Sequence, residues 1–82
     1  MYWLCYVRDG KTRVVIMNGW SLMHARLSAA CLGLGTFVEG HPIDPATMAG
    51  VPLQTVGRVM SRQEAMAMLN LPKKPPAPQR DP

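Results

Sequence analysis

The chain has 82 residues and a mass of 9.0 kDa, which allows one domain close to the smallest size at which an apolar core closes without disulfides, metals or a second subunit. Hydrophobic residues make up 48% of it and charged residues 17%, a composition typical of a globular protein and unlike that of a wholly disordered chain. The formal net charge is +4, but half of the excess lies after residue 70, so the charge favours acidic partners only weakly.

The first predicted element is a β-hairpin. Residues 2–8 and 13–17 are rich in aromatic and β-branched side chains, and Asp9-Gly10 between them is the strongest short-range hairpin signal. A two-residue loop and a four-residue loop both keep the same side chains on the same face, because the side chains of a strand alternate with a period of two.

The two faces of this hairpin differ in composition. One face is apolar apart from Thr12 and is expected to pack against helices; it carries Trp3, Cys5, Val7, Val14 and Ile16. The opposite face, called the outer face from here on, combines apolar side chains with three cations near the turn. Its members are Tyr2, Leu4, Tyr6, Arg8, Lys11, Arg13, Val15 and Met17.

A helix is predicted after Ser21, whose hydroxyl can cap its first turn, and Gly33 and Gly35 are expected to end it. Apolar residues at helical spacing indicate the face that packs on the hairpin. The expected stripe consists of Met23, Leu27, Ala30, Cys31 and Leu34.

The second half of the chain is predicted to repeat the order of strand and helix. Residues 36–41 have the pattern of a third strand, and Asp44-Pro45 begins a short helical connector that Gly50 ends. Residues 55–60 are expected to form a fourth strand that contains Gly57. Ser61 and Glu64 have the spacing of a capping box, which predicts a last helix that ends at residue 69 or 70.

These elements predict an α+β fold with a ββαββα-like order. We expect a small two-layer sandwich in which a mostly antiparallel sheet carries two helices on one face. Residues 1–70 would form the single compact domain, and residues 71–82 a disordered, proline-rich basic tail. Residues 75–80 of that tail match a proline-x-x-proline-x-arginine ligand pattern, although such short patterns also arise by chance.

A two-layer fold would leave the outer face of the hairpin uncovered. Burying each of its large side chains is worth roughly 1.5 to 3 kcal/mol, so together they rival the whole stability of a small domain, about 5 to 15 kcal/mol. The cover could be the tail or the last helix of this chain, a second copy of the chain, or a different protein. We therefore expect a non-catalytic binding module that forms a homodimer or binds an unidentified protein through this face.

Two other functions are weighed against this one. Tyrosines beside three cations could bind nucleic acid, with rings stacked on bases and cations on phosphates. Cys31 follows His24 by two helical turns and could form a catalytic pair with it, but burial would raise the pKa of the thiol and make it inert. Core packing is therefore favoured for this pair.

No cofactor or metal site is predicted. Glu39 and His41 would share one face of a strand, but they supply two ligands where a structural zinc needs four. Cys5 and Cys31 are expected to be reduced. The longest weakly polar stretch, residues 27–38, is too short to span a bilayer, and the N-terminus lacks the basic region of a secretory signal, so we expect a cytoplasmic protein with no membrane partner.

Overall fold

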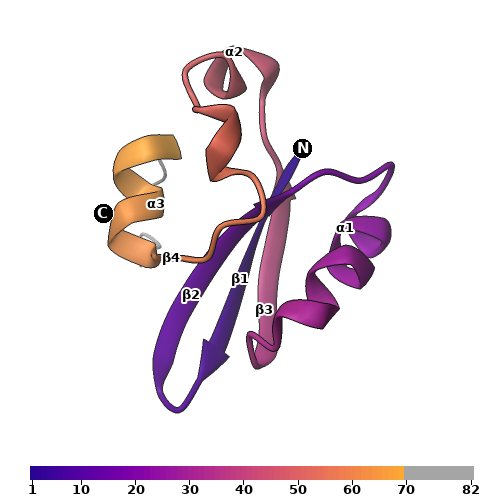
Figure 1. Ribbon diagram of the computed structural model, residues 1–82, viewed down its shortest axis with the longest axis vertical. Helices are drawn as coiled ribbons and strands as arrows, with labels where there is room; N and C mark the ends of the chain where they lie inside the picture. The colour runs from indigo at the N-terminus through magenta and orange to yellow at the C-terminus, as the bar shows by residue number, and fades with distance from the viewer. Residues whose placement is uncertain (70–82) are drawn as a thin grey trace, which may run out of the picture.

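The computed structural model describes residues 1–69, which form a four-stranded antiparallel sheet with a helix on each face (Figure 1). The strands are β1 (Tyr2–Arg8), β2 (Lys11–Met17), β3 (Thr36–Pro42) and β4 (Met60–Ser61), in the order β3-β1-β2-β4. The helices are α1 (Leu22–Ala29), α2 (Pro45–Met48) and α3 (Arg62–Leu69), with 3-10 turns η1 (Ala30–Leu32) and η2 (Leu53–Thr55). The α+β class, the antiparallel sheet and the order of elements are as predicted. The predicted tail at 71–82 lies outside the described residues.

The hairpin has the two-residue turn that Asp9-Gly10 predicts. Both residues have positive φ, 52° and 77°, as a type I′ turn requires, and Arg8 pairs directly with Lys11. The remaining pairs run in register from Val7 and Thr12 to Tyr2 and Met17. The side chains therefore divide between the two faces as the alternation predicted.

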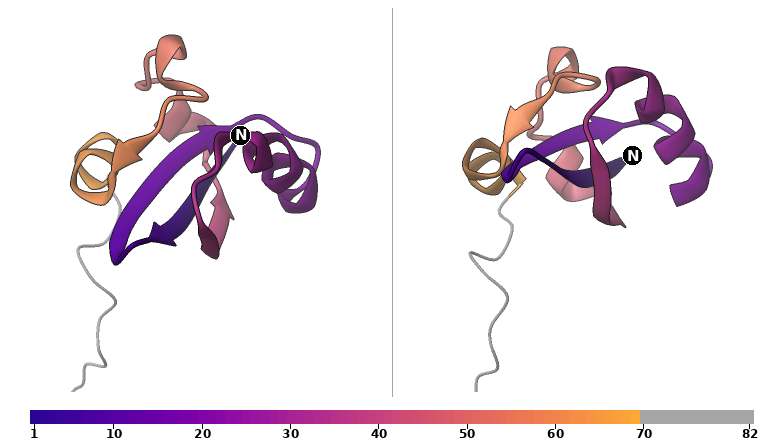
Figure 2. Two further views of the ribbon diagram at one scale, coloured as in Figure 1. Left: turned by 60° about the horizontal axis from the view of Figure 1, so that its bottom comes forward. Right: turned by 90° about the horizontal axis from the view of Figure 1, so that it is seen from below.

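The two helices lie on opposite faces of the sheet, so the prediction of both helices on one face of a two-layer sandwich is wrong (Figure 2). The reason is the strand order. The chain leaves β2 and returns as β3 on the far side of β1, and such a crossover has to pass over one face of the sheet. The crossover contains α1 and covers the outer face. The later segment with α2, η2 and α3 packs on the other face.

The outer face of the hairpin packs against α1 through small helix residues. Leu4, Tyr6 and Val15 form a buried cluster with Ala25 and Ala29, and Leu34 completes it. The helix lies close over the edge of the sheet at Gly40, where an added Cβ would lie only 2.6 Å from Cδ1 of Leu22 and 2.8 Å from Cδ2 of Leu4. Close packing here depends on residues without large side chains.

The opposite face of the sheet carries the second core. Side chains of β1 and β2 meet α3 and the segment between β3 and β4 there, and the cluster contains Trp3, Cys5, Val14, Ile16, Ile43, Val51, Met60, Ala65 and Leu69. The predicted inner face thus packs against a helix, as expected. That helix begins at the predicted cap, because the amide of Glu64 donates to Oγ of Ser61 at 3.1 Å.

The predicted strand at residues 55–60 is largely replaced by a turn. Only Met60 and Ser61 pair with β2, while Val56 makes a single parallel bridge to Ile16. Gly57 has a φ of +84°, and its amide donates to the carbonyl oxygen of Ile16 at 2.8 Å. The left-handed residue breaks the extended run, so β4 is a short edge strand.

Candidate functional site

The outer face of the hairpin is not an open surface. Leu4 and Val15 are fully buried and Tyr6 is 6% exposed, all beneath α1, while Tyr2 and Met17 are partly buried. Arg8 and Lys11 are exposed and Arg13 is half-buried. The expectation that this face lacks cover is therefore wrong, because the chain covers it with its own first helix. Only the three cations near the turn are still accessible.

Three large exposed apolar side chains lie at α1, two of them on the helix and one just before it. Trp20 is 91% exposed, Met23 61% and Leu27 66%. Met23 and Leu27 are four residues apart and lie on the same side of α1, and Trp20 precedes the N-cap Ser21 and stacks on His24 in the first turn. Met23, Leu27 and Cys31 belong to the stripe that was predicted to pack on the hairpin, but all three are exposed. We call Trp20, Met23 and Leu27 the apolar stripe.

The helix presents its small side to the sheet because the sheet side chains below it are already large. Tyr6 and Leu4 fill the space between the two layers, so the facing helix positions must be small, and they are Ala25 and Ala29. These alanines form their own i, i+4 pattern in the sequence. That pattern, set against the bulk of the outer face, was the signal that could have identified the apolar stripe as exposed.

The N-terminal end of the stripe is held by local contacts. Oγ of Ser21 accepts a hydrogen bond from the amide of His24 at 3.2 Å, as the sequence predicted. The ring of His24 stacks on Trp20 with centroids 4.8 Å apart and an interplanar angle of 9°. Nδ1 of the same ring accepts from the amide of Trp20 at 3.2 Å. Trp20 is thus oriented by the first turn of α1 while its other face is open to solvent.

An open groove of about 380 Å³ runs beside the C-terminal half of the stripe. Met23 and Leu27 line one wall, and Phe37 from β3 lines the other. The guanidinium carbon of Arg26 lies 3.9 Å from the centroid of the Phe37 ring, a cation–π contact that places a positive charge over the groove. Tyr6 packs edge-on against Phe37 with centroids 5.5 Å apart.

A second hollow, of about 360 Å³, lies at the hairpin turn and meets the groove at Gly33 and Leu34, which line both. It is basic. Its lining consists of Arg8, Asp9, Lys11, Arg13, Leu32, Gly33 and Leu34. A guanidinium nitrogen of Arg8 donates to the carbonyl oxygen of Gly33 at 2.8 Å, which joins the hairpin to the end of η1. We call this hollow the basic hollow.

The charges of the described residues are divided between the two sides of the sheet. On the α3 side, Arg58 forms an ion pair with Glu64 at 3.3 Å. Arg62 forms an ion pair with Glu39 at 3.9 Å. The other four cations make no ion pair within residues 1–69, and all four lie on the α1 side. They are Arg8, Lys11, Arg13 and Arg26, and Asp9 is the one carboxylate in the lining of the groove and the basic hollow.

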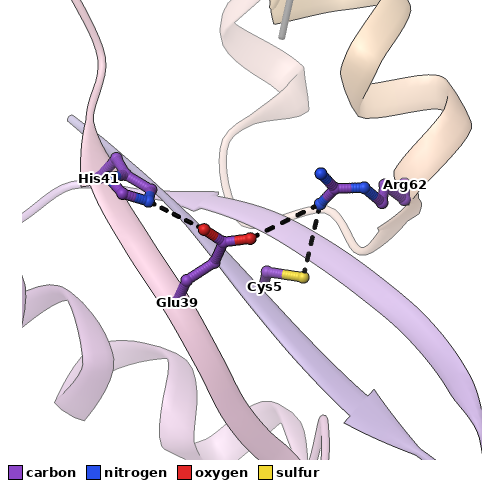
Figure 3. A network of polar contacts seen from close by, with 4 residues as sticks. All are labelled: Cys5, Glu39, His41 and Arg62. Atoms are coloured by element: carbon purple, nitrogen blue, oxygen red, sulfur yellow. Dashed lines mark hydrogen bonds and ion pairs between the residues drawn. The ribbon is translucent and has the colours of Figure 1, made fainter. Parts of the chain in front are cut away.

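Figure 3 shows a polar network on the opposite side of the sheet, where Glu39 contacts both His41 and Arg62. Nε2 of His41 lies 3.0 Å from the carboxylate of Glu39, and Arg62 also approaches the sulfur of Cys5 at 3.9 Å. Burial raises the pKa of the Cys5 thiol, and the nearby Arg62 lowers it only in part. A buried, protonated thiol is a poor nucleophile, and the contacts of this network join α3 to β3 and β1.

The catalytic pairing of Cys31 with His24, weighed as an alternative, is not formed, and the favoured prediction that Cys31 packs in the core is wrong. Cys31 is exposed and its thiol donates to the carbonyl oxygen of Ser28 at 3.4 Å, while His24 stacks on Trp20. Cys5 and Cys31 are both free thiols. Within residues 1–69 no group of three or more metal-binding side chains comes together, and none of the helices there has the length and hydrophobicity to cross a membrane.

Comparison of the chain with protein-family models, with curated proteins and with solved structures finds no match. A function is therefore inferred from the α1 side alone. Three features are available there: the apolar stripe, the groove capped by Arg26, and the basic hollow at the hairpin turn.

Proposed function

We propose that the protein is a non-catalytic binding module and that its partner docks on the outer side of α1. The apolar stripe carries this proposal. Scattered exposed apolar residues are ordinary on a protein surface, but a continuous stripe of large ones marks an interaction site. Met23 and Leu27 are both large and exposed on one side of α1, Trp20 is exposed just before the helix, and the other side of α1 already completes the core.

The magnitude of the apolar contribution indicates a complex that needs further contacts. Burying three large side chains is worth roughly 1.5 to 3 kcal/mol each, or about 5 to 9 kcal/mol together. Association costs an estimated 4 to 15 kcal/mol in lost translational and rotational freedom. The stripe alone therefore supports only a weak complex. The cations beside it have to contribute to any stable one.

Charge complementarity favours a partner with an acidic, partly apolar docking segment over a second copy of this chain. Arg26 lies beside the stripe, and Arg8, Lys11 and Arg13 lie around the adjoining hollow. A second copy of the chain would bring the same cations and only Asp9 as an acidic side chain in the lining of the groove and the basic hollow, so it offers little negative charge to pair with them. Carboxylates of a different protein would pair with the same cations while its apolar side chains cover the stripe.

The alternative that this face binds nucleic acid needs aromatic rings on which bases can stack, and the rings near the cations are not free for stacking. Tyr6 is buried, and the ring of Phe37 is already covered by Arg26, so neither offers an open face for a base. Trp20 does have an open face, but it lies at the opposite end of α1 from the basic hollow. The cations alone do not distinguish a nucleic acid from any other anion.

The experiment compares two exposed leucines in different parts of the fold, Leu27 at 66% and Leu53 at 78% exposure. Leu27→Gln removes the large side chain at the C-terminal end of the stripe, and Leu53→Gln makes the same change at η2, on a different part of the surface. Tagged wild-type protein and both variants are used to capture partners from the native host, and the captured segment is mapped by cross-linking. We expect Leu27→Gln alone to lose the partner, and the cross-linked segment to be acidic.

Three results would contradict the proposal. Equal capture by the two variants would show that the stripe is not the contact. A captured segment that is basic or neutral would remove the role of the cations. A dimeric mass by light scattering that Leu27→Gln reduces to the monomer would make the occupant a second copy of the chain.

A further inference from the structure

The basic hollow is formed by three cations that the hairpin places on one face. Arg8 and Lys11 are directly opposite each other across the two strands, and Arg13 follows two residues along β2 on the same side. Directly opposite side chains have Cβ atoms about 4.5 to 5.5 Å apart, and diagonal neighbours about 7 to 8 Å. The three cationic groups therefore surround one small volume.

The side of the basic hollow that faces the hairpin is formed by residues 32–34, and backbone contacts fix its position against β1. Gly33 has a left-handed backbone conformation with φ of 62°. Its carbonyl oxygen accepts a hydrogen bond from the guanidinium of Arg8 at 2.8 Å. At Gly35 the chain passes so close to β1 that an added Cβ would collide with the carbonyl oxygen of Val7. Arg8 uses one of its five N–H donors in the contact to Gly33, so its guanidinium is oriented while other donors stay available.

The charge around the hollow is not neutralised within the described residues. Its three cations take part in no ion pair among residues 1–69, and Asp9 is the one acidic side chain in its lining. Like charges directly opposite each other in a sheet are destabilising. A bound anion would relieve this repulsion, whereas the cations on the α3 side already have carboxylate partners.

We propose that the basic hollow is a binding site for a compact anion that bears a phosphate group. A phosphate dianion offers several acceptor oxygens to three converging cations, and guanidinium groups bind it through paired hydrogen bonds. A single carboxylate carries less charge and fewer acceptors. The volume of about 360 Å³ lies at the lower end of the range for small-ligand sites. The hollow adjoins the groove beside the apolar stripe, and its cations are the ones assigned above to a partner's carboxylates, so a bound phosphate would compete with that partner. Binding of a phosphate to the protein alone does not require the partner, so the two proposals can fail separately.

Pyrophosphate and inorganic phosphate are the probes, and acetate at equal ionic strength is the comparison. Binding is measured by calorimetry, and its location by the amide shifts of Lys11 and Gly33. Arg13→Gln removes one cation from the hollow, and Arg58→Gln makes the same change in an ion pair on the other side of the sheet. Lys11→Gln is the second variant, at an exposed position whose side chain the fold does not need.

We expect pyrophosphate to bind more tightly than phosphate and acetate not to bind detectably. Arg13→Gln and Lys11→Gln should each weaken pyrophosphate binding by about tenfold, the loss of one charge-assisted hydrogen bond, and Arg58→Gln by less than twofold. Equal weakening by all three variants would show attraction by net charge alone and overturn the proposal. Equal binding of acetate would also overturn it.

The source of the phosphate is distinguished by a third probe. A single-stranded oligothymidylate of twelve nucleotides carries only singly charged diesters. If it binds more tightly per phosphate than pyrophosphate, and weakens steeply with salt, the hollow belongs to a nucleic-acid surface and the compact site is refuted. Weaker binding of the oligonucleotide than of pyrophosphate supports the compact site.

Discussion

Leu4→Ala tests whether α1 covers the outer face of the hairpin. Leu4 has no exposed surface, and its neighbours are α1 and Gly40, which has no side chain to move into a void. Replacing a buried leucine by alanine costs about 2 to 5 kcal/mol, and more where the site collapses poorly. We therefore expect a loss of about 3 to 5 kcal/mol of unfolding free energy, which is a large fraction of the stability of a domain this small.

The assay is equilibrium urea unfolding, with the loss taken from the midpoint at an unchanged slope. Leu53→Ala is the control, because the same atoms are removed from an exposed side chain, and it should change the stability by less than about 0.5 kcal/mol. Equal midpoints for Leu4→Ala and Leu53→Ala would refute the packing of α1 on this face. In the Leu4→Ala background, Gly40→Ala should be less harmful than in the wild type, because the Cδ2 atom that its Cβ would meet is gone.

Two further predictions concern charge. Lys11→Glu places a carboxylate opposite Arg8 and should raise the unfolding free energy by about 0.2 to 1 kcal/mol at low salt; no gain would show that the two cations do not repel each other. Burial raises the pKa of the Cys5 thiol above its ordinary 9.0 and that of the Tyr6 phenol above its ordinary 10.0, so both groups ionise first in the unfolded chain. Stability should therefore be fully present below about pH 9 and fall as the pH rises through the two raised values. A urea midpoint that is constant from pH 7 to about pH 11 would contradict the burial of these groups.

Local signals in the sequence predicted the local parts of the fold. Asp9-Gly10 predicted the turn and the division of side chains between two faces, because a type I′ turn fixes the register of both strands. Ser21 and Ser61 predicted where two helices begin, because a cap involves only residues within one turn. Each of these features depends on neighbours in the sequence and on nothing else.

The position of α1 could not be predicted in the same way, because it depends on the strand order. Placing β3 beside β1, and not beside β2, turns the connection through α1 into a crossover, and a crossover covers a face. The stripe that contains Met23 and Leu27 was predicted to face the sheet because its apolar residues recur at helical spacing. The larger stripe is usually the buried one, but here the sheet supplies the bulk and the helix supplies the small residues.

The cations near the turn were predicted as a group, and the structure places all three around one hollow. Their wall at Gly33 was not predicted, because it comes from a residue 25 positions away from Arg8. The separation of paired and unpaired cations could not be predicted either. Arg58 and Arg62 are distinguished from the others only by the carboxylates that folding brings to them.

The two sides of α1 are under different constraints. Ala25 and Ala29 are fixed by the sheet beneath them, and any enlargement there would lift the helix from the hairpin. Met23 and Leu27 are largely exposed and are not part of either buried core cluster. Substitutions at Met23 and Leu27 can therefore change which partner the chain binds without changing its fold. The same two positions are the ones at which a new binding preference could be designed.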